Sequence, residues 1–433
     1  MKTKECSFGK PFPLTERFVV IAIVLCSMLL VAFPAIAADQ NIQKERVSVL
    51  TASEDDFVLG IYGNANEDDT IDMRDMTYVK LIFFGERPET ELVDAKYDGE
   101  INPLDFVQIK LIIVGKENEL TIIDDPPFGK VKTIKMPVER FITGSTYIPE
   151  AVRGIDATDK LVGVGSSSVK REDFYPEISK LPSIGRYSTP DIEEMLNLKT
   201  DLYFTYGNSP DIAYEDKIED VGIRVVRFSF YGDTVLQDVL KLGYILDNVE
   251  VAEELSSYIN EYLEILKART EGLTEDERPK VYVGSYSRGK YYASGAGSTG
   301  DAMCVMAGGI NIAADLPSSY VDPEWLVEQN PEFVILTGYG TLDEIKGKCD
   351  VFMNRTELAE VDAVKNGRVY AIRTDVNYVR SFIGTLYRAK LFHPDLFDDL
   401  DPHAIHEEYL DRFQGVPITY VGEGVFIYPP IEE

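Results

Sequence analysis

The chain has 433 residues, of which 45% are hydrophobic and 27% charged, and its formal net charge is -31 at pH 7. This length is too great for one ordinary core and predicts two or three domains, while the composition is that of a globular protein. The acidic balance excludes nucleic acid as a partner, because phosphates require a basic surface. It suits a solvated extracytoplasmic surface or cation binding.

The first residues resemble an export signal. Basic residues precede an apolar run from Phe18 to Ala32, and Ala35-Ile36-Ala37 offers a small-residue cleavage site. We expect residues 1–38 to be a cleaved signal and residues 39–56 a linker, with an uncleaved membrane anchor as the alternative. The chain is therefore expected to be exported, to the outer face of the cytoplasmic membrane or to the periplasm.

An internal repeat occupies residues 57–118. Each unit is an acidic twelve-residue loop followed by an apolar helix, and the second unit begins thirty positions after the first. Calcium explains this spacing, because a hard cation needs six or more oxygens and such a loop supplies them from positions 1, 3, 5, 7, 9 and 12. The predicted ligands in the first loop are Asn64, Asn66, Asp68, Thr70, Asp72 and Asp75. We expect Ile71, at position 8, to face the paired loop.

The second loop is less complete. Its candidate ligands are Asp94, Asp98, Glu100, Asn102 and Asp105. Gly99 suits the sharp turn, but Lys96 occupies position 3, and an ammonium group cannot bind calcium. The ammonium could instead lie in the site and replace the ion, so the occupancy of this loop stays open.

The two loops resemble type I dockerin modules, because each ends in aspartate rather than glutamate and is followed by a single helix. The resemblance implies a small all-α domain with calcium as its cofactor. Dockerins bind cohesin modules, but a spacer or surface-assembly role is equally open here. Residues 119–134 are expected to link this module to the rest of the chain.

From residue 135 onward, short β-runs alternate with helical stretches, as in α/β folds. The predicted strands cover 140–143, 161–164, 202–205 and 224–230 in the first half, and 280–285, 333–337 and 369–373 in the second. The two halves contain similar segments, because residues 191–207 align without gaps with residues 322–338. We predict lobes at 135–248 and 273–415, a connecting helix within 249–272, and a tail at 416–433.

These pieces, taken in order, resemble the periplasmic binding proteins for iron–siderophore, haem and cobalamin uptake. The segments that carry the resemblance are 139–147, 161–165, 181–185, the segment around Glu193, 222–226, the segment around Glu324, and 366–370. The resemblance implies two Rossmann-like lobes joined by one long helix, with a ligand captured between them and delivered to an ABC permease dimer. It also implies that Glu193 and Glu324 dock on the permease. A carboxylate in the first turn of a helix stays ionised, which agrees with that role.

The resemblance places the ligand between the lobes. The candidate contacts are Ser145, Tyr147, Tyr187 and Tyr206 from the first lobe, and Arg288, Tyr291, Tyr292, Tyr378 and Arg380 from the second. Tyrosines stack on flat ligands or hydroxamate arms, and arginines bind carboxylates with two hydrogen bonds. The one tryptophan, Trp325, lies beside Glu324 rather than in the expected cleft, which favours an iron(III) chelate over cobalamin. Haem stays a further alternative.

Cysteine and histidine usage limits the chemistry. Beyond the signal only Cys304 and Cys349 remain, which in an exported chain form a disulfide or stay as buried thiols. The three histidines all lie in the C-terminal helical region, so the cleft lacks ligands for bare zinc or manganese and a base for serine hydrolysis. We therefore expect capture and delivery without covalent chemistry. The rivals are an assembly protein acting through the dockerin-like module and a two-lobed metal-cluster enzyme, for which cysteines are too few.

Overall fold

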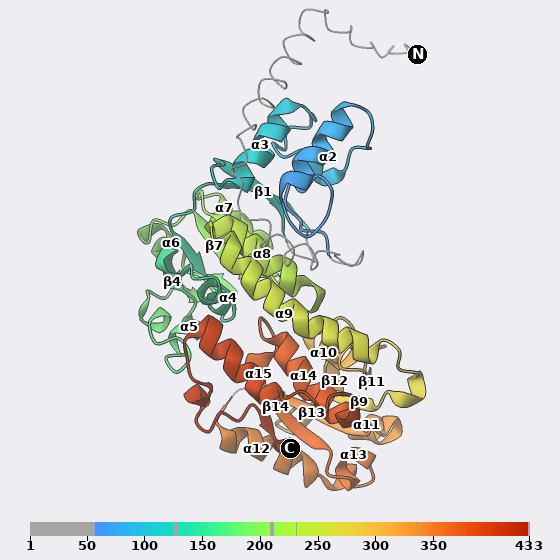
Figure 1. The fold of residues 1–433 in the computed structure, drawn as a ribbon. Helices are drawn as coiled ribbons and strands as arrows, with labels where there is room; N and C mark the ends of the chain where they lie inside the picture. Colours follow the sequence, from blue (N-terminus) through green and yellow to red (C-terminus); the bar gives the residue numbers. More distant parts are fainter. Residues whose placement is uncertain (1–56, 125–128, 208–211, 231, 339, 432–433) are drawn as a thin grey trace, which may run out of the picture.

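A computed structural model of the chain describes residues 57–124, 129–207, 212–230, 232–338 and 340–431. The predicted export signal at 1–38 and the linker at 39–56 lie outside these residues. A small N-terminal module sits at one end of the molecule, and two lobes follow it along a long helix (Figure 1). Within the described ranges, no helix has the length and apolar character needed to cross a membrane.

Two helices and the loops that precede them form the module. Helix α2 (Met73–Phe83) and helix α3 (Pro103–Ile113) each begin at a capping box, formed by Asp72 with Asp75 and by Asn102 with Asp105. A 3-10 turn, η1 (Glu91–Val93), precedes the second loop. The same capping chemistry at both helices confirms the predicted repeat.

The segment predicted as a linker, residues 119–134, is instead part of a β-hairpin. Strand β1 (Glu119–Ile123) pairs antiparallel with β2 (Val131–Lys135). Leu120, Ile122 and Ile134 are buried, and Ile122 also bridges to Ile61 of the module. The hairpin therefore packs the module onto the first lobe, because alternate side chains of its strands enter a shared core.

The N-terminal lobe contains a parallel sheet in the order β4-β3-β7-β8. Its strands are β3 (Phe141–Thr143), β4 (Leu161–Val164), β7 (Leu202–Tyr206) and β8 (Arg224–Phe228). The surrounding helices are α4 (Ile148–Gly154), α5 (Ser166–Val169), α6 (Ile192–Asn197), α7 (Ile212–Glu219) and α8 (Val235–Leu246). A small ladder joins β5 (Gly185–Arg186) to β6 (Thr189–Pro190), and η2 (Thr158–Lys160), η3 (Ile178–Lys180) and η4 (Gly232–Thr234) are short turns. The strands are short apolar runs, as expected for a sheet covered on both faces.

One helix, α9 (Val249–Thr270), connects the lobes. It begins beside the module and runs down to the C-terminal lobe, packing on α8 and then on α14 (Figure 1). Leu255, Ile259 and Leu266 are fully buried along one face, so this helix is amphipathic, and its position confirms the predicted connecting helix.

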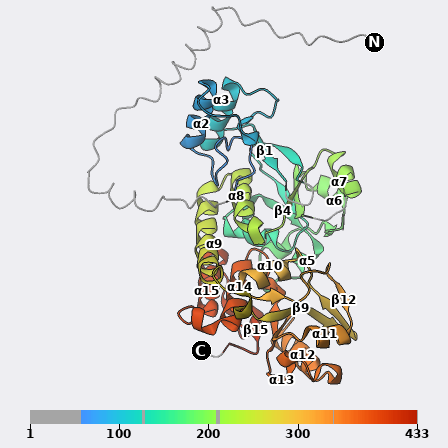
Figure 2. The same ribbon diagram turned by 90° about the vertical axis from the view of Figure 1, so that its right-hand side faces the viewer.

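The C-terminal lobe contains a mixed sheet in the order β12-β10-β9-β13-β14-β15, with β11 beside β9. Strands β9 (Lys280–Ser287), β13 (Phe333–Gly338) and β14 (Val369–Arg373) are parallel, as is β11 (Ile310–Asn311). Strands β10 (Lys290–Ala293), β12 (Ser319–Val321) and β15 (Ile427–Tyr428) are antiparallel to their neighbours. The helices are α10 (Thr299–Met306), α11 (Pro323–Gln329), α12 (Leu342–Met353), α13 (Asp362–Lys365), α14 (Ser381–Phe392) and α15 (Pro402–Tyr409). Figure 2 shows the two lobes one above the other, with α9 along one side.

The structure contradicts one sequence prediction for this lobe and decides between the two alternatives for its cysteines, a disulfide or buried thiols. Residues 416–431 are not a separate tail, because β15 pairs with β14 and Phe426 is buried. Cys304 and Cys349 are both free and buried. Cys304 belongs to the core on one face of the sheet and Cys349 to the core on the other face, so no disulfide can join them.

Candidate functional site

A cavity of about 540 Å³ opens between the lobes. Its lining residues are Thr146, Tyr147, Ser167, Lys170, Arg171, Tyr187, Tyr206 and Tyr378. Most of them follow the carboxyl ends of strands: β3 leads into Tyr147, β4 into Lys170 and β14 into Tyr378. Ligands of open α/β sheets bind at this edge, so the cavity lies where the fold predicts a ligand site.

Four tyrosine rings wall the cavity. Tyr147 of the first lobe stacks on Tyr378 of the second, with ring centroids 3.3 Å apart and an interplanar angle of 18°. Tyr206 meets Tyr147 edge-on at 6.1 Å and Tyr187 edge-on at 5.0 Å. The backbone N–H of Thr146 donates to the Tyr206 hydroxyl at 3.0 Å, which fixes that ring. Such a wall suits a flat or bulky ligand with π surfaces.

Two basic side chains supply the charge of the cavity. Lys170 is exposed and forms no ion pair within the described ranges. Arg171 pairs across the lobes with Asp375, at 2.8 Å, and Asp375 also bonds Arg373. Burial alone would raise the pKa of Asp375, but Arg171 and Arg373 lower it, so the carboxylate stays charged. The cavity keeps a local positive character in a strongly acidic chain, which favours an anionic ligand.

The structure brings four of the predicted contacts into this cavity and leaves the others outside it. Tyr147, Tyr187, Tyr206 and Tyr378 line it. Ser145 is buried and caps the first turn of α4, accepting from the backbone N–H of Tyr147 at 3.1 Å.

Three candidates from β9 and β10 also lie away from the cavity. Arg288 is exposed at the turn between these strands. Tyr291 is buried and donates its hydroxyl to Glu357 at 3.0 Å. Tyr292 packs edge-on against Tyr320 at the surface. The sequence shows that these residues follow a strand, but not that the hairpin turns their side chains away.

Arg380 corrects the prediction most clearly. Its side chain is 1% exposed, and its Nε lies 2.7 Å from Oε1 of Glu150 on the other lobe. Its Nη1 donates to the Tyr420 hydroxyl at 3.0 Å, and Tyr409 donates to the same Glu150. Arg380 therefore joins the lobes and is not available to a ligand, because withdrawing it would leave a buried carboxylate unpaired.

Thr146, Ser167, Lys170 and Arg171 line the cavity, and the sequence analysis missed them. The signal was present, since Lys170 and Arg171 follow the predicted strand 161–164 at its carboxyl end. The pairing of Arg171 with Asp375 joins residues about two hundred positions apart along the chain and could not be seen from spacing.

The two predicted docking acids occupy equivalent positions. Glu193 is the second residue of α6 and Glu324 the second residue of α11, and both side chains are exposed. The Asp191 carboxylate accepts from the backbone N–H groups of Glu193 and Glu194, so it caps α6. Each lobe thus presents one ionisable acid at a helix start.

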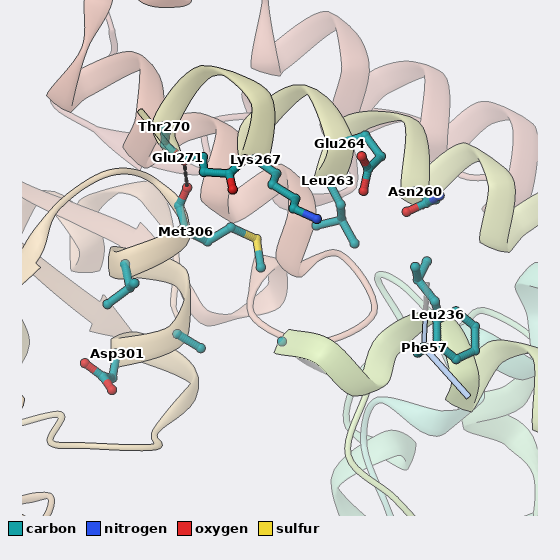
Figure 3. A pocket seen from close by; sticks show the side chains of 13 residues that line it. Phe57, Leu236, Asn260, Leu263, Glu264, Lys267, Thr270, Glu271, Asp301 and Met306 are labelled. Carbon is teal, nitrogen blue, oxygen red and sulfur yellow. Dashed lines mark hydrogen bonds between the residues drawn. The ribbon is translucent and has the colours of Figure 1, made fainter. Parts of the chain in front are cut away.

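A second cavity, of about 580 Å³, lies along α9 between α8 and α10 (Figure 3). Leu236, Leu263 and Met306 give it an apolar wall, and Glu264, Lys267 and Asp301 stand at its rim. None of the predicted ligand contacts lines it. It is bounded mainly by helices rather than by strand ends, so the interlobe cavity is the better candidate site.

The two loops of the module fold alike. In the first, Asp75 accepts from the backbone N–H groups of Asn66 at 3.1 Å and Asp72 at 2.8 Å. In the second, Asp105 accepts from Lys96 at 3.0 Å and Asn102 at 2.8 Å. The position-12 aspartate closes both loops through equivalent backbone bonds.

The donors of the first loop fit a hard cation only in part. They are all oxygens, but Arg74 pairs with Asp68 at 3.1 Å and with Asp72 at 2.9 Å. Across the described ranges, no three His, Cys, Asp or Glu side chains are arranged to hold a metal ion. Threonine, asparagine and backbone oxygens would have to complete the set. Lys96 is exposed and makes no ion pair in those ranges, so its ammonium does not fill the second loop.

The backbone of Ile71 bonds to the N-terminal lobe, because its N–H donates to the Tyr244 hydroxyl of α8 at 3.0 Å. Tyr62, just before the first loop, meets Tyr97 of the second loop, with ring centroids 4.7 Å apart.

Two α/β lobes around a ligand-sized cavity, joined by one long helix, define a two-lobed solute-binding protein. The chain belongs to the periplasmic binding protein family, whose profile matches residues 143–376, more than half of its length. Proteins of this family are exported and work with ABC transporters.

Named relatives differ in what they bind. The molybdate-binding protein MolA of Haemophilus influenzae is 23% identical over 296 residues, which cover 60% of this chain and 81% of that protein. The vitamin B12-binding protein of Vibrio cholerae is 24% identical over 249 residues, covering 55% and 82%.

Solved structures show the same fold. MolA bound to molybdate matches with a TM-score of 0.59 at 21% identity, covering 69% of this chain and 98% of that one. Helicobacter pylori CeuE, solved with nickel and histidine, matches with a TM-score of 0.58 at 20% identity, covering 70% and 98%. Because proteins with such different ligands share the architecture, the fold alone does not select the ligand.

Proposed function

We propose that this protein is the solute-binding component of an ABC importer and captures an iron(III) chelate of the siderophore type between its lobes. The observation that carries the proposal is the interlobe cavity, with four tyrosines as walls and Lys170 and Arg171 as its cations. A volume of about 540 Å³ falls in the usual range for small-molecule sites and is roomy for a single oxyanion. An anionic chelate with flat arms satisfies both the rings and the charges.

Cobalamin and haem are alternatives within the same mechanism. The rings of Tyr147 and Tyr378 already stack on each other, with centroids 3.3 Å apart, so a planar macrocycle would stack against this pair rather than enter between the rings. Vitamin B12-binding relatives favour that alternative. The positive charges of Lys170 and Arg171 favour ligands with exposed carboxylates or other negative groups, which ferric chelates and haem carry.

Calorimetric titration of the mature chain tests the proposal, with ferric siderophores, ferric citrate, haem, cobalamin and molybdate as separate ligands. We expect one-to-one binding of a ferric chelate. Tyr187→Ala combined with Lys170→Ala should weaken it about a hundredfold, since a ring contact and a charge-assisted bond are each worth 1–2 kcal/mol. Tyr292→Ala, on the same molecule but away from the cavity, is the matched control. Binding of molybdate alone, or of no chelate, would contradict the proposal.

Delivery to the permease is proposed to use Glu193 and Glu324. Reversing their charge should abolish uptake by a reconstituted importer while leaving the chelate affinity unchanged. Glu328→Lys, at the other end of α11 and also exposed, is the control. Equal uptake by the Glu193→Lys, Glu324→Lys double variant and the wild type would exclude docking through these acids.

A surface-assembly role is the second candidate, favoured by an apolar stripe on α3. Leu104 and Val107 are 58% and 49% exposed on this helix, and Val114, which caps its carboxyl end, is 52% exposed. Exposed apolar patches of this kind mark interaction sites. In this role the two loops would hold calcium and the dockerin-like module would bind a cohesin-like partner. Calcium-dependent capture of a cohesin module, lost in Leu104→Asp with Val107→Asp, would support it.

A further inference from the structure

An acidic cavity lies where the module meets the N-terminal lobe. Its volume is about 450 Å³, and its walls come from the first loop, the end of α3, and the junction of α8 with α9. The carboxylates in its lining are Glu117, Asp247, Glu250 and Glu253. None of the described residues that line it is lysine or arginine, so the wall supplies no side-chain cation.

Glu117 is the exceptional member of this lining. Its side chain is 8% exposed, and its Oε2 atom has no hydrogen-bond partner within the described part of the chain. Asp247 lies close enough to raise the pKa of Glu117 by charge repulsion, and its Oδ1 also approaches Gly115, 3.0 Å from a Cβ built there. An unpaired buried carboxylate costs several kcal/mol, and a second one next to it adds repulsion.

The backbone around the cavity adds to the negative potential. Helices α3 and α8 both end here, and a helix carboxyl end carries about half a negative charge. The amino end of α9 opposes this with about half a positive charge, which is small against four carboxylates. Lys160 reaches the end of α8 but donates to the Leu246 carbonyl, not to a carboxylate.

We propose that this junction binds a hard divalent cation, with calcium as the best match, through Glu117 and Asp247, and that the ion holds the module against the lobe. Neither residue belongs to the two twelve-residue loops, so the site is separate from them. With two carboxylates in place, backbone carbonyls and water supply the remaining oxygens, a mixture that calcium accepts. One carboxylate comes from each partner of the junction, which gives the ion its bridging role.

Native mass spectrometry and calcium titration of the mature chain test this site. Glu117→Gln and Asp247→Asn should each remove one bound ion, or weaken one site at least about tenfold, because each loses one of two charged ligands. Glu119→Gln, an exposed acid two residues from Glu117, should match the wild type. Asp75→Asn disables the first loop instead, so loss of loop calcium and loss of junction calcium are separable.

Thermal unfolding gives a second test, because the effect of Glu117→Gln on the melting temperature should change sign when calcium is added. In chelator, Glu117→Gln should melt above the wild type, because it removes an unpaired buried charge. In millimolar calcium the order should reverse, because only the wild type keeps the ion. Burial raises the pKa of Glu117, so a protonated side chain is the rival explanation. The proposal would be overturned in favour of that rival if the melting difference between Glu117→Gln and the wild type were the same with and without calcium, and if both variants kept the wild-type ion count.

Discussion

Three arginines, two at the lobe interface and one within α14, sit in three different environments. Arg171 reaches into the cavity and shares Asp375 across the lobes. Arg380 is buried and forms an ion pair with Glu150. Arg388, on α14, is fully buried with Nε and Nη2 unpartnered among the described residues, and burial lowers its pKa to about 10. The family resemblance made Arg380 a candidate ligand contact, yet its partner Glu150 is 230 positions away, and only the folded chain reveals that pairing.

A buried carboxylate in the N-terminal lobe gives the first prediction. Glu215 lies 2.6 Å from Lys132 of the hairpin and 2.9 Å from Arg227 of β8. Burial alone would raise its pKa, but these hydrogen bonds lower it to about 2. Against an unfolded pKa of about 4.3, this stabilises the folded state by roughly 3 kcal/mol at neutral pH.

Glu215→Gln should therefore destabilise the protein by about 3 kcal/mol at pH 7. The folded pKa is depressed, so this stabilisation exists above pH 4.3 and is lost as pH falls toward 2. The difference between variant and wild type should shrink by more than half at pH 3, as measured by urea unfolding. Glu177→Gln, at an exposed ion pair, is the control. A pH-independent difference would contradict the linkage.

At the scale of single elements, the module is joined to the lobe by a few defined contacts. The sequence predicted both loops, both helices and most strands of the lobes, because capping residues and apolar periodicity are local signals. It missed the β1–β2 hairpin and β15. Strand β15 pairs with β14 far back along the chain, Ile427 with Ile372, and such pairing leaves no local pattern. Strands β1 and β2 pair with each other, so the hairpin had a local signal that was overlooked.

Tyr244 on α8 gives the second prediction. Its hydroxyl accepts from the Ile71 backbone N–H at 3.0 Å. Tyr244→Phe should loosen the first loop from the lobe by about 1 kcal/mol, the usual net value of one buried hydrogen bond. Hydrogen exchange at the Ile71 amide should speed up about fivefold. Tyr258→Phe, which removes a hydroxyl bonded to the Ile405 carbonyl instead, should leave that amide unchanged.

Lys96 gives the third prediction. In the second loop it stands where the first loop has Asn66, and its ammonium leaves the position-3 ligand absent. Lys96→Asn should let this loop bind calcium at least about tenfold more tightly, because one oxygen replaces a repelling charge. Calcium titration would measure the gain. An unchanged affinity would mean that the loop geometry, rather than Lys96, limits binding, and Lys116→Asn serves as the charge-matched control.

At the scale of the whole molecule, the lobes are held by more than the connecting helix. Arg380, Glu150 and Tyr409 form a buried polar cluster between them, and Gln414 donates to the Glu150 carbonyl at 3.2 Å. Such a cluster resists large hinge opening, because separation would strand buried charges. The sequence predicted a connecting helix, but not the buried residues that hold the lobes together.

Small ligand-induced motion is the fourth prediction. The radius of gyration in solution scattering should change by less than about 1 Å when the chelate binds, since only local closure is available. Glu150→Gln should enlarge that change, because it weakens the ion pair to Arg380. A ligand-free radius several ångströms above the bound one in the wild type would contradict a restrained hinge.

The position of the only tryptophan has a practical consequence. Trp325 stands next to exposed Glu324 at the start of α11, half-buried against the core of the C-terminal lobe, and it does not line the interlobe cavity. Its intrinsic fluorescence should therefore respond weakly to ligands in the cleft and strongly to any surface that covers α11. The chain thus carries a built-in optical reporter that separates the arrival of a transporter from the arrival of its cargo.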